Sequence, residues 1–81
     1  MPCKVSISTE LLDTLRWAHP GDPYESEAVL WDILILAKFE QSLNLQVPVF
    51  TFTASIRSHT GSEELRLRYT AGDPVLIEIS H

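Results

Sequence analysis

AVLWDILILAKF, residues 28–39, is the stretch that decides how this chain folds. Only Asp32 and Lys38 interrupt its apolar side chains. At about 100° per residue these side chains surround a helix instead of forming a single stripe. Such a helix needs cover on nearly every side, so we predict a long helix from about Asp22 to Leu43 at the centre of the fold. The stretch is too short and too interrupted to span a bilayer.

Length and composition predict one small domain over residues 1–81. A hydrophobic content of 44% is ordinary for a globular protein. The single cysteine, Cys3, excludes an internal disulfide. No signal peptide is visible before Lys4, and we therefore expect a cytoplasmic protein.

The net charge of −5 is concentrated in the first half of the chain, because residues 1–45 hold seven acidic and three basic side chains. An acidic surface disfavours nonspecific contact with nucleic acid or with anionic membranes. We therefore expect no membrane partner, and DNA is a disfavoured one.

The residues before the long helix predict a short strand and a first helix. Val5 and Ile7 alternate with polar residues, as in a half-buried strand. Ser8 or Thr9 can then cap a helix. Its apolar stripe would be Leu11, Leu12, Leu15 and Ala18. Trp17 falls on the polar side of this helix, and we predict that it contacts a partner protein.

Two signals compete for the start of the long helix. Asp22 offers an N-cap, Pro23 suits the first helical position, and Glu25 completes an Asp-x-x-Glu capping box. Ser26 offers an alternative start four residues later. The helix should end near residues 43–44, where the apolar pattern stops.

The second half of the chain, residues 47–80, predicts a three-stranded antiparallel meander. Apolar and polar residues alternate over residues 47–56, 65–70 and 75–79, and short turns at residues 58–62 and 71–74 separate these runs. Glu78 could face Arg66 or Arg68 across strands. The predicted fold is therefore α+β with the order β-α-α-β-β-β.

One chain of this size lacks the surface to cover the long helix completely. We predict a core that includes Leu15, Leu30, Ile33, Leu34 and Phe50. The remaining apolar side chains would form a homodimer interface, because a large exposed apolar patch marks an interaction site. That predicted interface comprises Val29, Trp31, Ile35, Leu36 and Phe39. We also expect the first strand to find its neighbour in the second copy.

Residues 4–43 resemble a ribbon-helix-helix unit, through the strand KVSIS, the short helix STELLDTLRWA and the helix opening SEAVLWDIL. In that family two chains pair their first strands into a ribbon that enters the major groove of DNA, and a helix N-terminus meets a phosphate. The resemblance implies that Lys4, Ser6 and Ser8 read bases and that Ser26 binds phosphate. The family includes repressors and the DNA-binding halves of antitoxins.

No motif in the sequence predicts catalysis, a metal or a cofactor. Cys3 could combine with His19, His59 or His81, but the spacing matches no metal site. Asp32 is either buried and paired with Arg16 or Arg57, or it lies on a solvent-exposed line along the helix. An unpaired buried carboxylate costs free energy, which favours the exposed position.

These observations favour a non-enzymatic, dimeric protein-interaction module, such as the antitoxin or inhibitor half of a small regulatory pair. The alternative is a ribbon-helix-helix DNA-binding regulator. A small α+β enzyme or metal protein is the third hypothesis, and it has the least support in the sequence.

Overall fold

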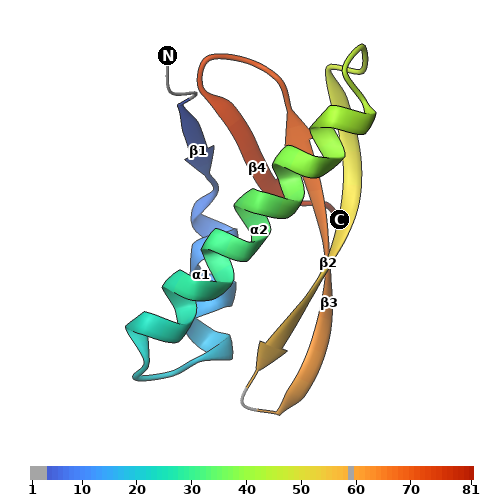
Figure 1. The fold of residues 1–81 in the computed structure, drawn as a ribbon. Helices are drawn as coiled ribbons and strands as arrows, with labels where there is room; N and C mark the ends of the chain where they lie inside the picture. The colour runs from blue at the N-terminus through green and yellow to red at the C-terminus, as the bar shows by residue number, and fades with distance from the viewer. Residues whose placement is uncertain (1–3, 59) are drawn as a thin grey trace.

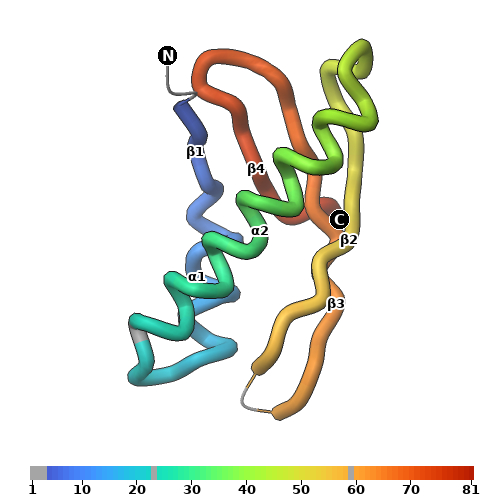
Figure 2. The backbone as a smooth tube through the Cα atoms, viewed as in Figure 1, coloured from blue at the N-terminus to red at the C-terminus, as the bar shows by residue number. Residues whose placement is uncertain are grey.

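The computed structural model describes residues 4–58 and 60–81, apart from the side chain of residue 23. It confirms the α+β class and the β-α-α-β-β-β order (Figure 1). The elements are β1 (Val5–Ile7), α1 (Thr9–Ala18), α2 (Pro23–Leu43), β2 (Val49–Ser58), β3 (Gly61–Thr70) and β4 (Val75–Ile79). Helix α2 crosses obliquely in front of the sheet, from the end of α1 toward the N-terminal end of β2 (Figures 1 and 2).

The four strands form one sheet in the order β1-β4-β3-β2. Strands β2, β3 and β4 make the predicted antiparallel meander. Strand β1 pairs with β4 in parallel, with Val5 opposite Val75 and Ile7 opposite Ile77. The neighbour that we expected from a second copy is thus supplied by the last strand of the same chain.

The hairpin between β2 and β3 is tighter than the sequence indicates. The predicted turn at residues 58–62 is largely absorbed into the strands, because Ser58 and Gly61 already form a register pair. The Ser58 hydroxyl accepts the backbone N–H of Thr60 at 3.2 Å. Gly61 has a φ of 128°, a conformation that only glycine adopts readily. His59 lies outside the described residues.

The start of α2 follows the first of the two competing signals. The Asp22 carboxylate accepts the backbone N–H of Glu25 at 3.1 Å, and the helix begins at the next residue, Pro23. Ser26 has a different role. Its hydroxyl lies 3.3 Å from the carbonyl oxygens of Asp22 and of Leu15, so it links the first turn of α2 to α1.

One hydrophobic core joins both helices to the inner face of the sheet. The predicted core residues Leu15 and Ile33 are almost completely buried, and Leu30, Leu34 and Phe50 pack against the core while partly exposed. The buried residues are Leu11, Leu15, Ala18, Val29, Ile33, Ala37, Phe52, Ala54, Ile56, Leu67, Tyr69 and Ile77.

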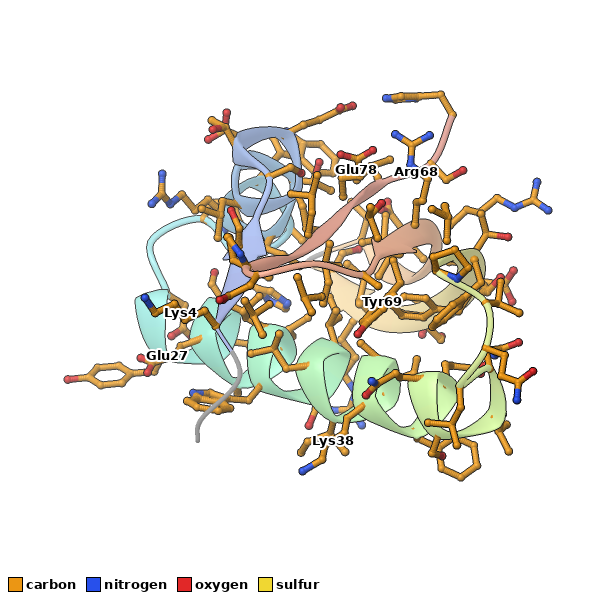
Figure 3. All side chains as sticks on the ribbon, turned by 90° about the horizontal axis from the view of Figure 1, so that it is seen from above. Lys4, Glu27, Lys38, Arg68, Tyr69 and Glu78 are labelled. Carbon is orange, nitrogen blue, oxygen red and sulfur yellow. The ribbon has the colours of Figure 1, made fainter. Side chains whose placement is uncertain are left out.

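The opposite face of the sheet is largely polar, and no helix among the described residues covers it. Tyr69 points toward α2, whereas its neighbour Arg68 points to the other side, where it pairs with Glu78 (Figure 3). The strand alternation that predicted opposite faces is therefore confirmed, and Arg68 is the arginine that faces Glu78.

Candidate functional site

The outer face of α2 carries a row of exposed apolar side chains, which we call the outer stripe: Tyr24, Trp31, Ile35 and Phe39. Trp31, Ile35 and Phe39 follow one another at four-residue spacing and are 59%, 67% and 59% exposed. Tyr24 lies two turns before Trp31 and is 84% exposed. Residues at these spacings share one face of a helix. The outer stripe is therefore a continuous apolar surface on the solvent side of the molecule.

A second row, at the same spacing, explains why the outer stripe cannot turn inward. Val29, Ile33 and Ala37 are buried against the sheet, and each is offset from the outer stripe by roughly half a turn of helix. Helix α2 thus has two apolar faces. The chain itself covers only the face of Val29, Ile33 and Ala37.

Two of the five predicted interface residues contribute to the monomer instead of to the outer stripe. Val29 is only 7% exposed and belongs to the core, and Leu36 is half-buried and packs against it. Trp31, Ile35 and Phe39 are accessible as predicted. Tyr24 was absent from the predicted interface, although its seven-residue spacing from Trp31 was the available signal.

Charged residues border the outer stripe differently on its two sides. Glu27 and Lys38 are both exposed and lie eleven residues apart, which returns them to the same side of the helix after three turns. Lys38 points away from the sheet (Figure 3). The other border is acidic, with Glu25 and Asp32.

That acidic border lines a hollow of about 430 Å³ between α2 and β2. Glu25 and Asp32 lie on its helix side, and Arg57 lies on its strand side. Asp32 is exposed, which agrees with the second of the two positions considered from the sequence. It forms no ion pair with any residue that the structure describes. The hollow is lined by the acidic residues Glu25 and Asp32 of α2 and by residues 54–57 of β2.

Trp17 forms a second exposed aromatic site, on α1. It is 59% exposed and lines a shallow hollow together with Glu10, Asp13 and Thr14. Arg16 lies near the Asp13 carboxylate at 3.8 Å, on the exposed surface of the helix. An aromatic ring among carboxylates fits a partner that offers apolar surface and positive charge.

The residues of the DNA-binding alternative have other contacts in the fold. Lys4 is exposed, and Ser6 lies opposite Leu76 in the register of β1 and β4. Ser8 caps α1, since its hydroxyl accepts the Leu11 N–H at 3.2 Å. Ser26 joins the two helices, as described above. Glu25 and Glu27 flank Ser26 and place negative charge where a phosphate would bind.

The residues considered for metal binding do not assemble within the part of the chain that the structure covers. Among residues 4–58 and 60–81, no group of three or more His, Cys, Asp or Glu side chains could hold a metal ion. His19 caps the end of α1, and His81 reaches Glu10 at 2.8 Å. Cys3 and His59 lie outside the described residues.

No helix among the described residues has the length and apolar character needed to cross a membrane. Comparison with protein-family models, with curated proteins and with solved structures finds no match. The outer stripe and the Trp17 site are therefore interpreted from their own chemistry.

Proposed function

We propose that this protein is a non-enzymatic interaction module that works as a homodimer through α2. The observation that carries the proposal is the outer stripe, where Trp31, Ile35 and Phe39 are each more than half exposed on one helix face. Monomeric proteins rarely expose a contiguous apolar surface of this kind unless it is used for binding.

The stripe holds enough apolar surface to drive association. Two copies bring together six large side chains from Trp31, Ile35 and Phe39, each worth roughly 1.5–3 kcal/mol when fully buried. Association itself costs roughly 4–15 kcal/mol. Because these terms are of similar size, we expect self-association to depend on the whole stripe and not on any one side chain.

Sedimentation velocity at low micromolar concentration tests the proposal. Wild-type protein should sediment above the monomer mass of 9.2 kDa, and Ile35→Glu should return it to that mass. Thr53→Glu is the matched control, because Thr53 is exposed on the polar face of the sheet, away from α2. A wild-type monomer, or a dimer that survives Ile35→Glu, would exclude the proposed interface.

The acidic character of the chain supports a regulatory role toward a basic protein, as in an antitoxin- or inhibitor-like pair. Trp17 lies among Glu10 and Asp13, on a helix other than the one that carries the outer stripe. The dimer would leave this site free to bind another protein. In this proposal α2 assembles the module and Trp17 contacts the regulated partner.

A further inference from the structure

The charges that border the outer stripe indicate how a second copy would lie on it. We propose that α2 pairs with α2 of the second copy in antiparallel orientation, with Glu27 of each chain beside Lys38 of the other. This inference rests on the proposed function, because it names the occupant of the outer stripe and its orientation.

Glu27 and Lys38 lie on either side of Trp31 and Ile35 along the helix. Glu27 lies one turn before Trp31, and Lys38 lies about one turn after Ile35. Their midpoint therefore falls between Trp31 and Ile35. A twofold axis at this midpoint exchanges the two charges and also places each Trp31 beside Ile35 of the other copy.

Antiparallel pairing about such an axis brings the same border of both helices together. Each copy has one acidic and one basic residue on this border, so two Glu27–Lys38 pairs form, about 16 Å apart along the helix. The apolar residues between them are enclosed by complementary charges. The surface is thus self-complementary, as an interface between identical chains requires.

Parallel pairing would make poorer contacts, because it places the Glu27 border against the acidic border of the second copy. Glu27 would then approach Glu25 and Asp32, and like charges at close range repel. About the same axis the acidic borders of the two copies also face each other, so the two helices must roll toward the border of Glu27 and Lys38. This roll keeps Glu25 and Asp32 beside the hollow between α2 and β2 and out of the contact.

Charge-reversed variants test the orientation. Lys38→Glu and Glu27→Lys should each weaken self-association by about tenfold, because two attractive pairs become repulsive. The double variant, Lys38→Glu with Glu27→Lys, should recover the wild-type dissociation constant. A mixture of the two single variants should form heterodimers in preference to either homodimer, as measured by native mass spectrometry.

A matched control separates this pairing from general charge attraction. Arg16→Glu and Asp13→Lys change the net charge by the same amounts on the exposed surface of α1. A mixture of these variants should form homodimers and heterodimers in statistical proportion. Heterodimer preference in this control as well would overturn the inference.

The outcomes distinguish the inference from the proposed function. If Ile35→Glu breaks the dimer but the Glu27 and Lys38 variants mix statistically, the stripe is the interface and the antiparallel orientation is wrong. If Ile35→Glu leaves a dimer, or if the wild type is a monomer, both proposals are excluded.

Discussion

Arg68 and Glu78 lie directly opposite each other on β3 and β4 and form an ion pair on the face of the sheet that α2 does not cover. Their side chains are 46% and 21% exposed, so solvent weakens the attraction. A double-mutant cycle with Arg68→Ala and Glu78→Ala, followed by urea unfolding, should give a coupling of about 0.5 kcal/mol.

Arg66 provides the control for this cycle. It occupies the same face of β3 two residues away and is diagonal to Glu78 instead of opposite to it. The coupling between Arg66→Ala and Glu78→Ala should therefore be smaller. Equal coupling energies for the two arginines would show that a directly opposite position stabilises the pair no more than a diagonal one does.

Ile33 should contribute more to stability than its neighbour Leu34. Ile33 is 1% exposed in the centre of the core, whereas Leu34 is only partly buried at its border. Ile33→Ala should cost roughly 2–5 kcal/mol of unfolding free energy. Leu34→Ala should cost less in urea unfolding at the same protein concentration, and the reverse order would mean that α2 is rotated about its axis.

Ser26→Ala should loosen the contact between the helices, because it removes the hydroxyl that lies 3.3 Å from the Leu15 carbonyl oxygen. We expect a loss of about 1 kcal/mol in the free energy of unfolding. Ser42→Ala is the control, since the Ser42 hydroxyl donates to the Phe39 carbonyl oxygen within the exposed end of α2. Equal losses for the two variants would argue against a specific role for the link between helices.

Trp31 should report dissociation through its fluorescence. In the variant Trp17→Phe, Trp31 is the only tryptophan, and its emission should shift to the red on dilution as the outer stripe becomes exposed to water. In the variant Trp31→Phe, Trp17 should show no such shift. A dilution-dependent shift from Trp17 would place that residue, instead of the outer stripe, in the dimer contact.

Electrophoretic mobility shifts over a salt series test the DNA-binding alternative. We expect no specific binding, because Glu25 and Glu27 flank Ser26 and the chain is acidic overall. Specific, strongly salt-dependent binding that Lys4→Ala weakens would instead favour the ribbon-helix-helix regulator. Specific binding that Lys4→Ala leaves unchanged would direct attention to Arg66 and Arg68.

The elements themselves were predictable because their signals are local. The Asp22 cap, the alternation in β3 and the apolar run of α2 all act within a few residues, and the structure contains each of them. Which face of α2 points inward was less predictable. When a helix is apolar all round, the pattern of its side chains does not show which face points to the core. The sequence therefore predicts Val29 in the interface, although it belongs to the core.

Long-range pairing was the part that the sequence could not specify. Alternation placed Arg66 and Arg68 on one face, but only the register of β3 with β4 selects Arg68 as the partner of Glu78. Strand β1 has only three residues, and they do not indicate which strand will pair with it. Its pairing with β4 depends on how the whole intervening chain folds. The outer stripe was predictable in part, since Trp31, Ile35 and Phe39 follow from spacing alone.

The parallel pairing of β1 with β4 also has a consequence during protein synthesis. Val5–Ile7 leaves the ribosome some seventy residues before the strand that will hold it. Until Val75–Ile79 follows, β1 has no neighbour within the chain and the core lacks Ile77. Non-local pairings of this kind slow folding and leave apolar surface exposed in the nascent chain. The final strand therefore completes the sheet for the whole domain, and the apolar surface that Ile77 covers stays open until that strand has been made.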